Sequence, residues 1–325
     1  MTIISAKCIA KSKHPECNKT ISTVECVYPR WIHAEGRTHR LLSIGEDDKP
    51  EYYTPSPMED PNLSRNASSS RAMPVKRMIQ DIIDHPAIPM FWGQNQKGMQ
   101  AGGEINEYIR NPWKEGLSSI GTMLDRKSAW LQARDNAIKS AEAFDAAGYA
   151  KQIVNRLLEP FSHIKVVITA TEWTNFFGLR IHEAAEPHIK LLAERIKAAI
   201  NGTEAVTLRY GQWHLPYVDH EDSAKADTRP GDYWGELLKL STARCARTSY
   251  HTHDGRQPNF EEDLALYDRL VGSHPLHASP TEHQATPDRN VGSPEDGDVW
   301  ANPQKWGNLV GFIQHRKTLN GEHIR

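Results

Sequence analysis

The sequence predicts an α+β fold in which a mixed or antiparallel sheet is flanked by helices. Strand-like and helix-like segments are interspersed along the 325 residues without the regular strand–helix–strand rhythm of a doubly wound parallel sheet. Hydrophobic residues make up 38% of the chain and charged residues 25%, a balance typical of a globular protein that can bury a sizeable core. At roughly 100–200 residues per domain, this length allows one large domain or two smaller ones.

The first half of the chain begins with strands and continues into helices. Segments 3–10 and 21–33 are rich in Val, Ile, Thr, Tyr and Trp, which favours β-strands. Residues 44–63 carry four prolines and six acidic residues without any period, so we expect an acidic, proline-rich insertion there. A helix is predicted from Pro74 to about Asp84, because proline suits a first helical turn. Residues 127–158 are typical of helix, with a break near Gly148.

The second half alternates again. Residues 163–170 form a short apolar, β-branched run that predicts a strand. Residues 183–200 predict an amphipathic helix with four isoleucine and leucine residues on one stripe, and residues 260–271 repeat that pattern. We expect a flexible loop over 284–305, which is rich in Pro, Gly, Asp and Asn, and a closing strand over 308–314.

Charge and cysteine content exclude several classes of protein. Lys and Arg number 39 against 41 Asp and Glu, a net charge of −2, which argues against a general binder of nucleic-acid polymers but not against a small anionic ligand. The four cysteines contain no C-x-x-C and suggest a reducing compartment. No apolar run approaches the roughly 20 residues of a membrane span. We expect a cytoplasmic protein without membrane contact.

Common catalytic signatures are absent from the sequence. It contains no P-loop, no G-x-S-x-G and no G-x-G-x-x-G. The sixteen histidines lack the spacing of a zinc site, so we expect no metal.

Three polar constellations remain, each open to two interpretations. The run 64–71 (SRNASSSR) places three hydroxyls between two arginines before a helix, which suits either a phosphate or a simple helix cap. Arg156 and Arg180 each follow an apolar segment, as anion anchors or as structural ion pairs with Glu159 or Glu172. The segment 277–283 (HASPTEH) either binds a heteroaromatic ligand or forms a turn around Pro280.

Together these segments resemble the flavin-dependent thymidylate synthases. Residues 38–42 (THRLL) and 64–71 are similar to the family signature R-H-R-x-x-S-x-N-E-x-S-x-R, which the acidic insertion would interrupt. Residues 155–160 (NRLLEP) resemble its A-R-x-x-L-P element, and residues 169–180 and 185–189 resemble its ending. Residues 246–250 (ARTSY) and 277–283 resemble its beginning, A-R-x-S-Y and H-x-S-P-F-E-H, yet follow the rest. The chain therefore resembles a circular permutation of the family, of a phage type, which implies a single permuted catalytic domain over residues 1–325.

The resemblance implies an enzyme that transfers a one-carbon unit from methylenetetrahydrofolate to carbon 5 of dUMP, with FAD and NADPH, in a homotetramer. It implies a nucleotide site made by Glu35, Ser68, Ser69, Ser70, Arg71, Arg156 and Arg180, of which Ser69 and Arg180 would be catalytic. It implies a cofactor site made by Thr38, His39, Arg40, Asn66, Thr169, Ser279, Glu282 and His283.

Some positions depart from the family pattern. Thr38 replaces an arginine, Ala67 a glutamate and Glu35 a glutamine, while Thr169 and Thr171 stand at the N-x-R pair. These departures affect the flavin site more than the nucleotide site. They also leave two alternatives: a C5 hydroxymethylase acting on dCMP or dUMP for a virus that modifies its DNA, and an inactive nucleotide- or flavin-binding subunit.

Overall fold

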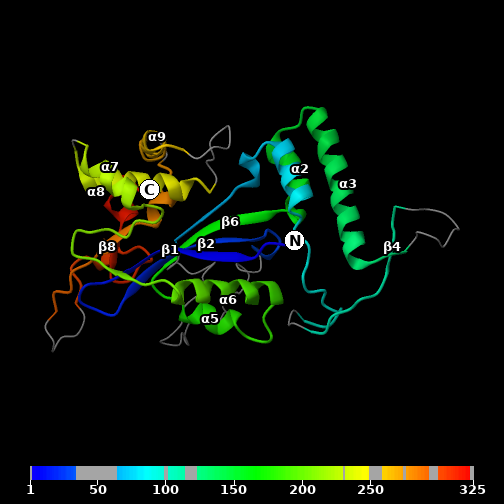
Figure 1. Ribbon diagram of the computed structural model, residues 1–325, viewed down its shortest axis with the longest axis horizontal. Coiled ribbons are helices and arrows are strands. Elements are labelled where there is room, and N and C mark those ends of the chain that lie inside the picture. Colours follow the sequence, from blue (N-terminus) through cyan, green and yellow to red (C-terminus); the bar gives the residue numbers. More distant parts are fainter. Residues whose placement is uncertain are drawn as a thin grey trace.

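A five-stranded mixed sheet forms the centre of the chain in the computed structural model (Figure 1). The structure describes residues 2–33, 64–98, 102–113, 123–229, 231–248, 258–273, 276–292 and 299–322. The strand order is β3-β6-β2-β1-β7, for strands β1 (Ser5–Lys13), β2 (Thr20–Pro29), β3 (Ser64–Ala67), β6 (His163–Ala170) and β7 (Val206–Thr207). All neighbours pair antiparallel except β1 and β7. The α+β class is thus confirmed.

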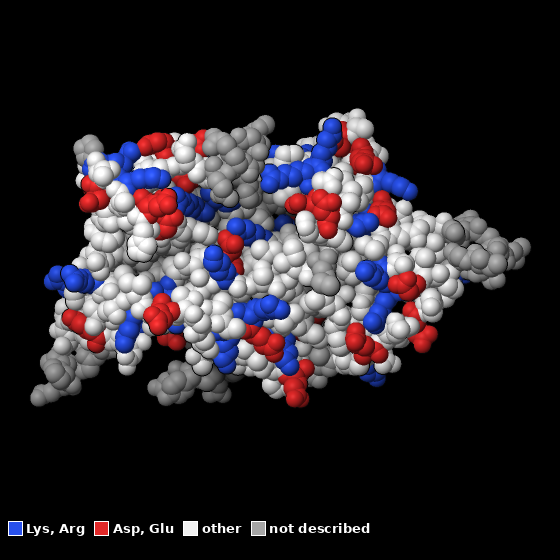
Figure 2. Space-filling model, in the orientation of Figure 1, with Lys and Arg blue, Asp and Glu red and all other residues white. Residues whose placement is uncertain are grey.

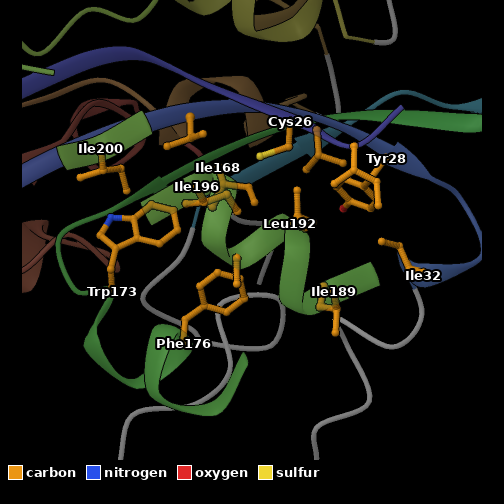
Figure 3. Packing of buried hydrophobic residues seen from close by; sticks show 14 of the residues in the cluster. Cys26, Tyr28, Ile32, Ile168, Trp173, Phe176, Ile189, Leu192, Ile196 and Ile200 are labelled. Atoms are coloured by element: carbon orange, nitrogen blue, oxygen red, sulfur yellow. The ribbon is translucent and has the colours of Figure 1, made fainter. Parts of the chain in front are cut away.

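One face of the sheet is covered by two helices, α5 (Thr174–Arg180) and α6 (Pro187–Asn201). Alternate residues of β2 and β6, including Cys26, Tyr28 and Ile168, point toward the stripe of α6 that carries Leu192 and Ile196 (Figure 3). All five are at most 3% exposed. This is the main core of the chain, and truncating such a leucine to alanine costs about 2–5 kcal/mol.

The opposite side carries two groups of helices, which Figure 1 shows toward different ends of the sheet. The first group is α2 (Val75–Asp84), α3 (Arg126–Ala146) and α4 (Lys151–Val154), which share one apolar cluster with Leu158 and Phe161. The second group is α7 (His220–Asp227), α8 (Tyr233–Ala246) and α9 (Phe260–Val271), of which α8 and α9 share another apolar cluster. Each group borders one end of the edge strand β3, where the predicted site residues lie.

Small sheets and single 3₁₀ turns complete the described chain. The two-stranded sheets pair β4 (Ile109–Arg110) with β5 (Met123–Leu124), and β8 (Ala285–Pro287) with β9 (Phe312–Gln314). The 3₁₀ turns are η1 (Ser70–Ala72), η2 (Asn155–Leu157), η3 (Glu159–Phe161), η4 (Ser279–Glu282), η5 (Pro303–Lys305) and η6 (His315–Thr318).

Most predicted elements are confirmed with small shifts at their ends. The strand over 163–170 and the helix over 260–271 have the predicted bounds, and the helix expected at Pro74 begins one residue later. The helix expected from residue 183 begins at Pro187, because the Glu186 carboxylate caps its first turn. The break expected near Gly148 follows α3, where Gly148 has a φ of +83°.

Other expectations need correction or fall outside the described residues. The region 284–305 is only in part a loop, since β8 and η5 lie in it and buried Asp288 accepts hydrogen bonds from Asn302 and Trp306. The closing strand over 308–314 is confined to β9. Helices α7 and α8 were not expected. The insertion over 44–63 lies outside the described residues.

The surface carries both signs of charge, and the cysteines form no disulfide. Basic and acidic side chains are interspersed over the face seen in Figure 2. Among the helices that the structure describes, none combines the length and apolarity needed to cross a bilayer. All four cysteines are free thiols, and burial raises the pKa of Cys26 and Cys245.

Candidate functional site

The serine turn, residues 68–71, continues directly from the edge strand β3. Strand β3 pairs with β6 from Ser64 opposite Thr169 to Ala67 opposite Val166, and the Ser68 N–H then donates to the Lys165 carbonyl at 2.8 Å. The chain turns through η1 into α2. Because the strands are antiparallel, the serine turn lies beside the beginning of β6 and the turns η2 and η3 that precede it.

Arg156 is joined to the serine turn through Glu159 and Asn155. Asn155 Nδ2 donates to the carbonyls of Ser70 and Met73 at 2.7 and 2.8 Å. The Ser70 hydroxyl donates to the Glu159 carboxylate, and Arg156 Nη1 lies 3.1 Å from the same carboxylate. The structure thus brings together Ser70 and Arg156, which the resemblance assigns to one nucleotide. It also shows for Arg156 the structural ion pair with Glu159 that was one of its two alternatives.

The three serine hydroxyls are not equally available to a ligand, whereas the resemblance assigned all three to the nucleotide. The Ser68 hydroxyl accepts from the Lys165 N–H at 3.0 Å, and the Ser70 hydroxyl is committed to Glu159. Only the Ser69 hydroxyl makes no hydrogen bond to any described residue. Arg71 is exposed and has no ion pair within the described ranges, and the Arg156 side chain is 56% exposed. A ligand here would therefore meet Ser69, Arg71 and Arg156.

A cavity of about 220 Å³ opens beside this turn. The lining from α2 and its flanking residues combines apolar Met73, Met78 and Ile82 with polar Asp81 and His85. The rest of the polar lining contains Arg30, Ser68, Ser69, Ser70, Ser162 and His163. This serine cavity, as we name it, places polar donors opposite an apolar surface, as small-molecule sites commonly do.

Arg30 is the charged residue of this cavity that sequence reasoning missed. It follows the buried strand β2, and its Nε donates to Ser162 Oγ at 3.2 Å while Nη2 donates to the Ser68 carbonyl at 3.3 Å. Burial lowers the pKa of Arg30, and Glu159 raises it in part, so the guanidinium stays charged. The signal was present, because Arg30 is a cation after an apolar run, the pattern used to select Arg156 and Arg180.

His163 lies in the same wall as a neutral imidazole. Its Nε2 accepts from the Ile3 N–H at 2.9 Å. Burial is the main reason that the pKa of His163 is lowered to about 4, and a hydrogen bond with the His85 backbone opposes this in part. At neutral pH Arg30 is therefore a cation of this cavity and His163 is not.

A buried chain of polar side chains crosses the sheet at the other end of β3. Ser12 Oγ lies 2.8 Å from His214 Nδ1, and His214 Nε2 lies 2.8 Å from Thr23 Oγ1. Thr23 Oγ1 lies 2.7 Å from Thr169 Oγ1, which lies 2.8 Å from His283 Nδ1. Burial lowers the pKa of both histidines to about 3, so both are neutral. We call these five residues the relay chain.

The relay chain changes the interpretation of the predicted cofactor residues. Thr169 and His283 are fully buried and tie the turn η4 to the sheet, so they support the structure around η4 instead of facing a ligand. Glu282 forms an ion pair with Arg316, whereas Ser279 is exposed. Asn66 lies in β3, which packs against η4. These residues, far apart in sequence, thus come together as expected. The side chains of Thr169, Glu282 and His283, however, already bond to other protein groups.

The described part of this end does not form a complete flavin site. Nε2 of His283 has no hydrogen-bond partner, but it is sealed from solvent and so cannot reach a large ring without rearrangement. Thr38, His39 and Arg40, which the resemblance assigns to FAD, lie outside the described residues, as does Glu35. We therefore derive no chemical step through a flavin.

Arg180 lies away from the serine turn. It ends α5, which follows the far end of β6 on the side covered by α6, and it is 2% exposed. Such burial is typical of a structural arginine, and Arg180 is not part of the site at the serine turn. Within the residues described, no three His, Cys, Asp or Glu side chains form a possible metal site.

Comparison with known proteins does not name a family. The sequence matches no protein-family model and no curated protein.

Proposed function

We propose that the chain binds a pyrimidine deoxynucleoside monophosphate at the serine turn and acts on it as a permuted flavin-dependent thymidylate synthase. The observation that supports this proposal is the joining of Ser70 and Arg156, predicted for one nucleotide, through the single carboxylate of Glu159. Around it stand two further groups suited to an anion, the unbonded Ser69 hydroxyl and the exposed Arg71. Guanidinium groups and hydroxyls bind phosphate through charge-assisted hydrogen bonds.

In this proposal the residues of the turn bind and orient the nucleotide. The Ser69 hydroxyl donates to a phosphate oxygen, and Arg71 and Arg156 balance the phosphate charge. Glu159 holds Arg156 in place and Asn155 fixes the backbone of the turn, so that less conformational freedom is lost on binding. The balanced surface of the chain is compatible with this role, because two local arginines suffice for one phosphate.

The proposal extends to both ends of β3. Four residues of strand span roughly 13 Å, so the phosphate site and the turn η4 lie about one nucleotide length apart along the same strand. The flavin, the folate and NADPH belong to the proposal through the resemblance alone. The same holds for the homotetramer and for a cytoplasmic location.

The decisive experiment is a visible spectrum together with a product assay. The purified full chain is incubated with dUMP or dCMP and methylenetetrahydrofolate, with and without NADPH and added FAD, and products are identified by mass. A yellow protein that makes a methylated nucleotide only with NADPH supports the synthase. A hydroxymethylated nucleotide made without NADPH replaces it with the hydroxymethylase.

Two further outcomes bear on the proposal. A colourless protein that binds dUMP, takes up no FAD and yields no product identifies the inactive binding subunit. A protein that binds neither dUMP nor dCMP refutes the synthase and the hydroxymethylase, and if it also takes up no FAD it refutes the binding subunit as well. A separate test concerns Arg180: if Arg180→Lys leaves turnover unchanged in a folded protein, Arg180 has no part in the reaction.

A further inference from the structure

The Arg30 guanidinium has one edge without a protein partner. Of its five N–H donors, Nε bonds to Ser162 and one on Nη2 bonds to the Ser68 carbonyl. Among the residues that the structure describes, none accepts from Nη1, and no carboxylate lies within ion-pair distance of Arg30. The free Nη1/Nη2 edge is the fork that binds carboxylate or phosphate with two parallel hydrogen bonds. Arg30 lines the serine cavity, so a ligand there meets this edge.

The charges around Arg30 leave a positive excess. Glu159 is the acidic group that acts most on Arg30, yet its carboxylate already pairs with Arg156 and accepts from Ser70. Arg71 is a further guanidinium on the serine turn, although neither Arg71 nor Arg156 lines the cavity. Asp81 lies in the cavity wall contributed by α2 but forms no ion pair with Arg30, so the cavity separates the two charges. An anion entering beside Arg30 therefore balances a charge that the described protein leaves uncompensated.

The size of the cavity limits which part of a ligand enters it. Its volume of about 220 Å³ is below the roughly 300–1,000 Å³ of pockets that hold a whole small ligand. The cavity therefore admits one end of a ligand, with the anionic group on the Arg30 wall. The apolar surface of Met73 and Met78 then faces the adjoining, less polar part.

We propose that Arg30 is a phosphate-binding residue: its Nη1/Nη2 edge bonds to two oxygens of a phosphate monoester while the Ser69 hydroxyl donates to the third. The identity of the ester as a nucleotide rests on the proposed function. Arg30 itself belongs to none of the segments that resemble the synthase family. Its role follows from the free fork, the charge excess and the cavity.

Isothermal titration of the full chain tests this role. The probes are dUMP, dCMP, deoxyuridine and inorganic phosphate, and the variants are Arg30→Met, which removes the charge, and Arg30→Lys, which keeps the charge without the fork. Arg126→Met is the matched control, because Arg126 is also partly exposed and pairs with Glu104, and neither residue lines the serine cavity. Thermal unfolding of every variant establishes that it folds.

Losing a bidentate charged contact lowers affinity about 10- to 100-fold, so we expect that loss for dUMP in Arg30→Met. Arg30→Lys should fall between Arg30→Met and the wild type. Deoxyuridine, which has no phosphate, should bind all variants alike, and Arg126→Met should bind dUMP as the wild type does. Inorganic phosphate should compete with dUMP for the wild type but not for Arg30→Met.

The possible failures separate the two proposals. If folded Arg30→Met binds dUMP as tightly as the wild type while Arg156→Met does not, Arg30 has no role and the proposed function stands. If phosphate binds in an Arg30-dependent way but no nucleotide binds, Arg30 keeps its role and the proposed function falls. Should Arg30→Met fail to fold, full dUMP affinity in Arg30→Lys would still overturn the forked contact.

Discussion

The two ends of strand β3 carry polar clusters that differ in how much of their hydrogen-bonding capacity is used. In the relay chain each hydroxyl and three of the four imidazole nitrogens bond to another member, and only Nε2 of His283 has no partner. In the serine cavity the Ser69 hydroxyl and one edge of Arg30 have no partner among the described residues. A polar cluster that satisfies itself holds strands together, whereas one with unused donors is prepared for a ligand.

The largest predicted effect is a loss of folding stability at low pH that comes from the two histidines of the relay chain. His214 and His283 have a pKa of about 3 in the folded chain, because burial disfavours the charged form, and about 6.5 when unfolded. Between these values the unfolded state binds more protons, so stability is full above pH 6.5 and is lost as the pH falls toward 3. From pH 7 to 5 we expect these two histidines to lower the free energy of unfolding by roughly 4 kcal/mol.

Urea unfolding at several pH values measures this loss. In the double variant His214→Asn, His283→Gln, the free energy of unfolding should depend less steeply on pH. The dependence that remains comes from His163 and His315, whose pKa values burial lowers to about 4. An unchanged slope in the double variant would show that the relay histidines are not buried as neutral groups.

The second prediction interrupts the relay chain at its centre. Thr169→Val removes a hydroxyl that bonds to both Thr23 and His283, and it should lower the free energy of unfolding by about 1–3 kcal/mol. Thr286→Val is the matched control, because the Thr286 hydroxyl has no hydrogen-bond partner, and it should be neutral. Equal stability of the two variants in urea would contradict the structural role of the chain.

The third prediction concerns charge at the serine turn. Arg156→Met should weaken dUMP binding about tenfold, since a charge-assisted contact is lost. The free energy of unfolding should change by less than about 1 kcal/mol, because the Arg156 side chain is 56% exposed and such pairs contribute little. Titration calorimetry and urea unfolding measure both quantities. Lys239→Met, which removes an exposed ion pair with Asp268, should leave dUMP binding intact.

The smallest effect distinguishes neighbouring serines. Ser69→Ala should weaken dUMP binding by up to about tenfold, because one hydrogen bond to the phosphate is lost, and should change stability by less than about 0.5 kcal/mol. Ser70→Ala should instead cost about 1 kcal/mol of stability, because Glu159 loses its hydroxyl partner. If both variants behave alike in binding and unfolding, the division of roles among these hydroxyls is wrong.

Local patterns predicted much of the fold. Strand β6 and helix α9 have the predicted bounds because β-branched residues and a single apolar stripe leave little choice. Helix α8 had no such stripe: Leu237, Leu238, Thr242 and Ala243 point in different directions and are all buried, so burial extends around the helix. A helix buried on several sides does not produce the amphipathic period that sequence reasoning detects.

The site was predictable only in part. The resemblance assigned Ser70 and Arg156 to one place, and the structure joins them, whereas Arg30 was missed and Arg180 lies elsewhere. Contacts between distant residues, such as Ser12 with His214 across 202 positions, leave no local signal. These long-range contacts determine which polar groups are already engaged, and therefore why Thr169 supports the sheet while Arg30 retains a free edge.

The shortness of β3 gives its alignment with β6 an unusual influence. Only four residues pair, and Ser68 then meets Lys165 through both its N–H and its hydroxyl. Sliding the strand by one position would invert every side chain and separate Ser68 from Lys165. Such a slip would displace both the serine turn and the contact with η4. The two Ser68–Lys165 hydrogen bonds thus fix the position of both ends of β3 at once.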